Sequence, residues 1–276
     1  MPVVGHVRLG LLTPSHIEQV ISAARKSGAS PSTVRMVHVV MRQMLDTDVR
    51  DGLVRRNVAA SIERPRVPRT DAVYLAPEQV RALLEAASGD RLEALWTLLA
   101  LTGMRRGEAL ALRWTDLDLS GSTAKVHRTL ARVGGRLTFD EVKSSRSRRV
   151  VPLADPVVAA LREHRRRQVA EQLAAPGWND EQGLVFVSRI GTPLEPHNAW
   201  RSFKTLARAA GVPDAKIHTL RHSAATAALA AGIPMKIVSD LLGHASLSIT
   251  ADTYRHVTAD LAHAAAADLA HAVLGP

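Results

Sequence analysis

Residues 92–114 read LEALWTLLALTGMRRGEALALRW, and this stretch carries the clearest structural signal in the chain. Its first ten residues are apolar nearly all round, which predicts a helix over 92–101 that is buried on every side. Thr102-Gly103 ends that helix, and a second helix is predicted to begin near Met104 and to end before Asp116. The stretch therefore predicts a helical core with a polar segment built directly onto it.

Arg105 and Glu108 are the polar residues that the apolar pattern of this stretch does not explain. Arg105 follows the glycine turn at a helix start, where the helix dipole disfavours a cation. Glu108, three residues on, can offset this by pairing with Arg105. Taken alone, these two residues are better explained as a surface ion pair, so they do not yet identify a site.

The rest of the chain predicts a mainly α fold with a small antiparallel β-sheet. Alternating and β-branched residues predict strands over Ala124–Leu130, Arg136–Val142 and Arg148–Leu153, with a hairpin turn at Gly134-Gly135. Proline and serine start signals and helical spacing predict the helices. These are expected from Thr13-Pro14 to about Ser27, from Ser30-Pro31 to about Gly52, after Ala76-Pro77, over 155–174, 196–210, 218–231 and 234–242, and from about 258.

The distribution of charge and a proline-rich segment divide the chain into two predicted domains. Residues 1–70 carry 11 basic and 5 acidic groups, out of 36 and 26 in the whole chain of 276 residues. Glu63 to Tyr74 (ERPRVPRTDAVY) is rich in proline and arginine and predicts an extended linker. We expect a small helical domain over 1–63, a linker over 64–74 and a larger domain over 75–276. On the helix after Ser30, an apolar stripe is expected at Val34, Val37, Met41, Met44 and Leu45.

Composition limits the partners. A net charge of +10 favours a polyanion such as DNA or RNA over a membrane surface, although charge alone also fits a merely soluble protein. The absence of cysteine excludes disulfides, thiolate catalysis and cysteine-based zinc sites. No apolar run approaches the roughly 20 residues that span a bilayer, and the N-terminal segment is too short and too interrupted for a signal peptide. We expect a cytoplasmic protein without a membrane partner or a small-molecule substrate.

Three further segments carry unexplained polar groups. Lys143, in EVKSSRSRRVVPL (141–153), is expected at a hairpin tip, where it could enter a groove or simply be solvated. His218, Arg221 and His222 open an otherwise small and apolar helix, HTLRHSAATAALAAG (218–232). Two histidines four residues apart can form a zinc pair, but Thr219 stands where a metalloprotease helix has glutamate, and Arg221 would face the metal. A capping or core histidine remains the alternative.

The last segment is LLGHASLSITADTYRHV (241–257), which contains His244 and Tyr254. A lone tyrosine near a C-terminus is more often a packing residue. Taken with the other three segments, however, it completes a set suited to phosphoryl transfer on a nucleic-acid backbone. Arginine forks bind phosphate oxygens and supply positive charge to the transition state. Tyrosine is a workable nucleophile once its proton is removed.

The combined pattern resembles the tyrosine recombinases, the phage-integrase type of enzyme, and their relatives the type IB topoisomerases. In that family the first arginine lies in T-G-x-R-x-x-E, as in Thr102 to Glu108, and the lysine stands nine residues before the proline of a V-P-L ending, as Lys143 does before Pro152. The H-x-L-R-H, L-G-H and D-T-Y-x-H-V boxes match residues 218–222, 242–244 and 252–257. The matches follow the family's order.

The resemblance implies a catalytic set of Arg105, Lys143, His218, Arg221, His244 and Tyr254, supported by Glu108. Tyr254 would attack a scissile phosphate and form a 3′-phosphotyrosyl bond, while Arg105 and Arg221 hold the phosphate oxygens. Lys143 would be the general acid, His218 the base facing Tyr254, and His244 a hydrogen-bond donor to the phosphate. No cofactor and no metal are implied. The function implied is site-specific recombination, such as integration of a phage or other mobile element.

Residues 5–59 are similar to the family's core-binding domain, with Arg35 and Arg42 expected to contact the backbone of double-stranded DNA. The first helix of that domain and the arm-binding domain have no counterpart, so we expect a chain truncated at its N-terminus. The resemblance also implies a homotetramer on DNA, assembled through the C-terminal helix. A type IB topoisomerase activity and a non-catalytic DNA-binding remnant remain open alternatives.

Overall fold

The computed structural model describes residues 3–68, 73–142 and 147–243 and divides into two compact units, 1–70 and 71–276. The predicted fold class is confirmed, because the described residues are mostly helical with short antiparallel strands. No helix in these described ranges is long and apolar enough to cross a membrane.

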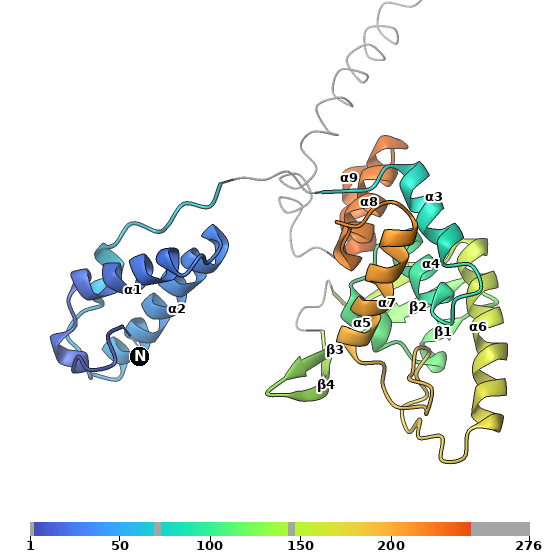
Figure 1. Ribbon diagram of the computed structural model, residues 1–276, viewed down its shortest axis with the longest axis horizontal. Helices are drawn as coiled ribbons and strands as arrows, with labels where there is room; N and C mark the ends of the chain where they lie inside the picture. Colours follow the sequence, from blue (N-terminus) through green and yellow to red (C-terminus); the bar gives the residue numbers. More distant parts are fainter. Residues whose placement is uncertain (1–2, 69–72, 143–146, 244–276) are drawn as a thin grey trace, which may run out of the picture. The chain divides into compact units, whose positions relative to one another are not determined.

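The first unit packs α1 (Pro14–Lys26) against α2 (Pro31–Arg50), followed by the short 3₁₀ helix η2 (Val58–Ser61) (Figure 1). Proline at the first helical position and the Ser30 side chain, which accepts from Thr33 N at 3.2 Å, begin α2 where the sequence predicted it. The core of this unit is small and aliphatic. Its buried members are Ile17, Ile21, Val34, Leu45, Val58 and Ala59.

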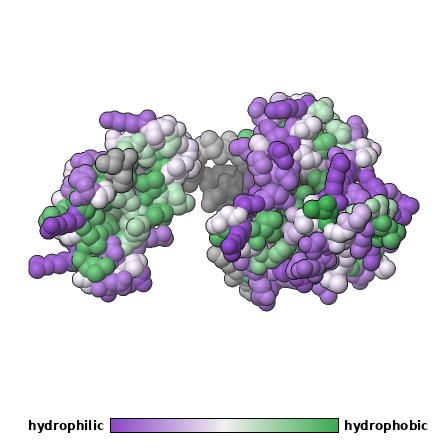
Figure 2. Space-filling view, turned by 60° about the horizontal axis from the view of Figure 1, so that its bottom comes forward, coloured by the Kyte–Doolittle hydropathy of each residue, from purple (hydrophilic) through white to green (hydrophobic). Residues whose placement is uncertain are grey.

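One residue of the stripe predicted for α2 is wrong. Met44 is 62% exposed, and His38, which is 1% exposed, lies on the buried face instead. The helical period explains the exchange: positions 34, 38, 41 and 45 lie along one face, whereas 44 lies well round the helix from it. Met36, Val40 and Met44 form a separate exposed apolar row. Figure 2 shows hydrophobic residues at the surface of this unit.

The second unit is built around α4 (Glu93–Thr102), which contacts α3, α5, α6 and α8. The prediction that α4 is buried nearly all round is confirmed, because seven of its ten residues are buried and Leu101 is the exposed apolar exception. Four of the other helices match their predicted spans within two residues, and α3 begins at its predicted start. They are α3 (Pro77–Ala86), α6 (Asp155–Ala174), α7 (Pro196–Ala209), α8 (Ile217–Ala230) and α9 (Met235–Leu242).

Two predictions for the strands need correction. The strands form two antiparallel sheets instead of one: β1 (Leu117–Asp118), β2 (Thr123–Val126) and β5 (Arg149–Pro152) in the order β1-β2-β5, and the hairpin β3 (Arg128–Val133) with β4 (Arg136–Glu141). The predicted Gly134-Gly135 turn joins β3 to β4, which project from one edge of this unit in Figure 1. β4 pairs with β3 and β5 pairs with β2, so these two strands do not form the hairpin that was expected around Lys143. Lys143 itself lies outside the described residues.

Two glycines allow close packing, one in the turn after α4 and one within α5 (Arg106–Leu110). Gly103 ends α4 with φ +63°, and a Cβ there would lie 2.5 Å from Leu242 Cδ2 of α9. Gly107 lets α5 approach β3, since a Cβ would lie 2.8 Å from the Leu130 carbonyl oxygen. The helix predicted from Met104 is therefore shorter than expected and starts at Arg106, which leaves Arg105 at its N-cap.

Candidate active site

Arg105 and Glu108 form the predicted pair. Arg105 Nη1 lies 2.7 Å from Glu108 Oε1, and the Arg105 backbone N–H donates to Glu108 Oε2 at 3.0 Å. The Glu108 side chain is 2% exposed, whereas that of Arg105 is 40% exposed. The carboxylate is therefore buried in the fold, and the guanidinium that it holds remains open to solvent and to an anion.

Arg221 lies on α8, 118 residues from the turn that it contacts. Its Nη1 donates to the carbonyl oxygen of Gly103 at 2.7 Å, and Arg221 is 3% exposed. Arg105 in turn donates from Nη2 to the Gly243 carbonyl oxygen at 3.0 Å, directly before His244. These two bonds draw together three of the four segments that the sequence singled out.

His218 and His222 lie on the first turns of α8. Their rings meet edge to face with centroids 4.6 Å apart. Burial, followed by the charges of Arg221 and Arg105, lowers the pKa of His218 below its ordinary value. Burial, His218 and Arg221 lower the pKa of His222 to about 4. Both rings are therefore neutral at neutral pH.

A metal is a poor fit to these histidines in the described part of the chain. No group of three or more histidine, cysteine, aspartate or glutamate side chains there could hold an ion. Arg221 also places a fixed positive charge near both rings, as its effect on their pKa values indicates.

A hollow of about 290 Å³ lies beside His218, between α5, α7 and α8. Its lining combines two cations with aromatic and aliphatic side chains, comprising Met104, Arg106, Trp200, Lys216, Ile217 and His218. Trp200 is 40% exposed and stacks with His197 at a centroid distance of 5.2 Å. Two cations and an accessible indole next to neutral imidazoles suit a nucleotide chain.

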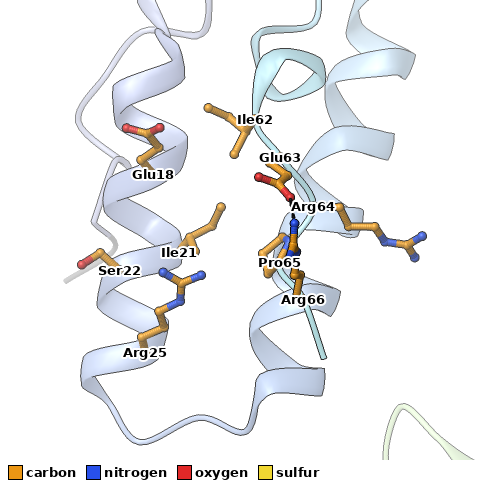
Figure 3. A pocket seen from close by; sticks show the side chains of 9 residues that line it. All are labelled: Glu18, Ile21, Ser22, Arg25, Ile62, Glu63, Arg64, Pro65 and Arg66. Carbon is orange, nitrogen blue, oxygen red and sulfur yellow. Dashed lines mark hydrogen bonds and ion pairs between the residues drawn. The ribbon is translucent and has the colours of Figure 1, made fainter. Parts of the chain in front are cut away.

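A larger hollow of about 600 Å³ lies in the first unit. Figure 3 shows Glu18, Ile21, Ser22 and Arg25 of α1 on one side of it and residues 62–66 on the other. The ion pair between Arg66 and Glu63 is exposed, with a distance of 3.3 Å between Arg66 Nη2 and Glu63 Oε1. No residue predicted for catalysis lines this hollow.

Three of the predicted catalytic residues, Lys143, His244 and Tyr254, lie outside the described residues. Val142 and Ser147 are the described residues on either side of the Lys143 segment, and Gly243 is the described residue directly before His244. Of the residues expected to bind DNA, Arg42 is exposed on α2 and Arg35 is half-buried on the same helix.

Arg149, the first residue of β5, was not predicted as a site residue from the sequence. Its side chain is 7% exposed and lies 2.9 Å from Glu108 Oε2 through Nη2. A signal for it does exist in the sequence. Side chains alternate along a strand, so Arg149 shares the inward register of buried Val151, while Val150 between them is 57% exposed. An arginine in an inward position needs a buried acidic partner.

Known proteins are similar to this chain in sequence. Residues 73–260 match the model of the phage integrase family. A XerC-like tyrosine recombinase of Caldanaerobacter subterraneus subsp. tengcongensis is 32% identical over 269 residues, which are 91% of this chain and 69% of the relative. An integrase of Saccharopolyspora erythraea is 26% identical over 297 residues, covering 88% of this chain and 68% of that one.

Solved structures support the same fold. The Tn1549 transposon integrase in complex with transposon right end DNA has a TM-score of 0.79 at 22% identity, covering 95% of this chain and 87% of that one. The XerH site-specific recombinase bound to palindromic difH substrate has a TM-score of 0.69 at 20% identity, covering 93% and 72%. With the family model spanning most of the second unit and a relative of 32% identity, the chain belongs to the phage integrase family of tyrosine recombinases.

Proposed function

We propose that this chain is a site-specific DNA recombinase that cuts and rejoins double-stranded DNA through a covalent bond to Tyr254. The observation that carries the proposal is the pair of hydrogen bonds from Arg221 to the Gly103 carbonyl and from Arg105 to the Gly243 carbonyl. They bring two arginines from distant segments to one turn, next to two neutral histidines. Relatives named integrase and tyrosine recombinase support the same reaction.

In this proposal Arg105 and Arg221 bind the non-bridging oxygens of the scissile phosphate. Their charge stabilises the pentacoordinate transition state without a metal ion. Glu108 orients Arg105, whose side chain is 40% exposed. His218 is neutral at working pH and accepts the Tyr254 proton as the oxygen attacks phosphorus. The P–O5′ bond breaks, and Lys143 protonates the leaving 5′ oxygen.

The product is a 3′-phosphotyrosyl linkage with a free 5′-hydroxyl, and His244 donates a hydrogen bond to the phosphate. Attack by a 5′-hydroxyl of another duplex reverses the chemistry and exchanges strands, so ATP is not consumed. Exchange between two duplexes needs four cuts and hence four active sites. We therefore propose a homotetramer on DNA joined by the helix predicted from about residue 258, which lies outside the described residues.

The units divide the work. We propose that residues 1–63 form a DNA-binding domain, with contacts to the phosphate backbone from Arg35 and Arg42, and that residues 64–74 are a linker to the catalytic domain, 75–276. The basic hollow beside His218 would take the nucleotides that flank the scissile phosphate. A DNA substrate also implies action in the cytoplasm.

The test does not require the target sequence in advance. The protein is incubated with a pool of nicked duplexes of random sequence, with and without EDTA. DNA that stays attached after SDS denaturation is recovered and sequenced. A nick near the scissile phosphate lets the short 5′-hydroxyl fragment diffuse away, so the covalent intermediate accumulates.

The proposal predicts covalent DNA enriched for one sequence, in equal amount with and without EDTA. Sequence-independent adducts together with relaxation of supercoiled plasmid would favour a type IB topoisomerase. Sequence-specific binding with no adduct would identify a non-catalytic remnant. Loss of the adduct in EDTA, restored by zinc, would overturn the role given to His218.

A further inference from the structure

Arg149 occupies the centre of the site, although no predicted chemical step uses it. Its guanidinium donates from Nη2 to Glu108 Oε2 at 2.9 Å and from Nη1 to Glu108 Oε1 at 3.3 Å. We propose that Arg149 is a positioning residue that keeps the phosphate-binding end of the site positively charged and that fixes the segments around it. This inference rests on the proposed function, because it concerns how Arg105 acts on a phosphate.

The Glu108 carboxylate is shared between two arginines. Each of its oxygens accepts from both of them: Oε1 from the side chains of Arg105 and Arg149, and Oε2 from the Arg105 backbone and the Arg149 side chain. Both terminal nitrogens of Arg149 and two donors of Arg105 thus hold the carboxylate in place. The orientation of Arg105 consequently depends on where Arg149 places Glu108.

Charge balance gives Arg149 a second effect. A buried carboxylate 2.7 Å from Arg105 Nη1 would by itself cancel most of the positive charge that Arg105 offers to a phosphate. With Arg149 included, the three side chains carry a net charge of +1, and only Arg105 is substantially exposed. The pKa of Glu108 agrees: burial would raise it, but the hydrogen bond and charge of Arg149, with help from Arg105, hold it below the ordinary value.

Arg149 also holds the chain on both sides of the site. Its Nε donates to the Leu241 carbonyl oxygen at 2.7 Å, at the end of α9 and three residues before His244. Its Nη1 lies 3.3 Å from the Ser147 carbonyl oxygen, four residues after Lys143. The carbonyls at a helix C-terminus carry partial negative charge and have no partner within the helix, so a buried arginine is a favourable donor to them.

The experiment compares single-turnover cleavage of a nicked duplex by five proteins: wild type, Arg149→Lys, Arg149→Met, Arg149→Met with Glu108→Gln, and Arg148→Met. Arg148 is the matched control, because it is the adjacent arginine and its exposed side chain pairs with the exposed Glu141. Thermal unfolding of each variant reports folding. DNA affinity, measured separately, reports binding.

We expect Arg149→Met to slow cleavage about 100-fold while DNA affinity changes less than about threefold. Arg149→Lys keeps the charge and should lose no more than about tenfold. Adding Glu108→Gln to Arg149→Met removes the uncompensated carboxylate, so cleavage should recover about tenfold. Arg148→Met should match wild type. A residue with a purely structural role would not produce recovery when a second buried partner is removed.

A second measurement is independent of turnover. Binding of inorganic phosphate, followed by ³¹P line broadening, should weaken about tenfold in Arg149→Met and return in the double variant. If wild type forms no adduct but phosphate binding follows this order, the proposed function fails and the inference about Arg149 stands. The inference is overturned if folded Arg149→Met cleaves DNA and binds phosphate within about threefold of wild type, or if the double variant is slower than Arg149→Met.

Discussion

The α4 helix and the charged cluster beside it are both buried, but they are buried for different reasons. Leu98 on α4 is 0% exposed and is surrounded by apolar side chains, so any residue of similar size and polarity could fill its place. Glu108, with a side-chain exposure of 2%, is tolerable there only because two arginines pair with it, the nearby Arg105 and the distant Arg149. The burial of apolar side chains such as Leu98 stabilises the fold, whereas the burial of a charged side chain such as Glu108 indicates the site.

The largest expected loss of stability tests the burial of apolar side chains. Leu98→Ala should lower the free energy of unfolding by about 2–5 kcal/mol, because it removes buried methyl groups and leaves a cavity. Leu173→Ala is the matched control on α6, where the leucine is 85% exposed, and it should change stability by less than about 0.5 kcal/mol. Urea unfolding measures both. Equal losses at the two positions would contradict the assigned core.

Arg221→Lys and Arg105→Ala test the charged residues of the site. Each should slow covalent attachment to DNA by about 10²–10³-fold, because each removes part of the charge and geometry that stabilise the transition state. Arg221→Lys keeps the charge at a buried position but loses the planar fork that reaches the Gly103 carbonyl. Single-turnover assays at saturating DNA separate this loss from weaker binding. Rates within about threefold of wild type would remove these arginines from the chemistry.

The first unit should contribute to DNA binding through charge alone. Affinity for double-stranded DNA should fall as salt rises, and Arg42→Ala should lower the slope of log affinity against log salt by about 0.9, the value for one lost phosphate contact. Arg35→Ala should act in the same direction. Glu78→Ala on α3, outside this unit, serves as a control that leaves the slope unchanged. An affinity that does not respond to salt would contradict the DNA-binding role of this unit.

The smallest effect expected is on the pH dependence of stability. The pKa of His222 is lowered to about 4 in the fold from an ordinary 6.5, so between these pH values the unfolded chain binds a proton that the folded chain does not. Stability from this group is complete above pH 6.5 and is lost as the pH falls toward 4. The melting temperature of His222→Gln should therefore decline less over that window than that of wild type. Parallel curves would show that His222 remains ordinary in the fold.

The same contrast explains what the sequence could predict. The apolar run over 92–101, the turn at Gly103 and the proline starts of α1, α2, α3 and α7 depend on local periodicity and backbone geometry, and the structure has them within two residues. The Arg105–Glu108 pair was also predictable, because three residues separate its members. Local rules decide such features.

Features that depend on distant partners were predicted less well. Arg149 reaches Glu108 across 41 residues, and SSRSRRVV looks like a solvated basic turn until strand register is considered. The strands were expected in one sheet, but β2 pairs with β5 while β3 and β4 pair with each other. Which strands pair depends on residues far apart in the sequence, and the alternating pattern within one strand does not determine it. The positions of Lys143, His244 and Tyr254 stay predictions.

The most direct measurement of the central claim is covalent attachment of the Tyr254→Phe variant to a nicked substrate selected by wild type. The substitution removes the attacking oxygen and keeps the ring, so DNA binding and the melting temperature should be nearly unchanged. The SDS-resistant adduct should disappear in Tyr254→Phe and persist in Tyr74→Phe, which changes the other tyrosine of the chain. An adduct that still forms in Tyr254→Phe would contradict the assignment of Tyr254 as the nucleophile.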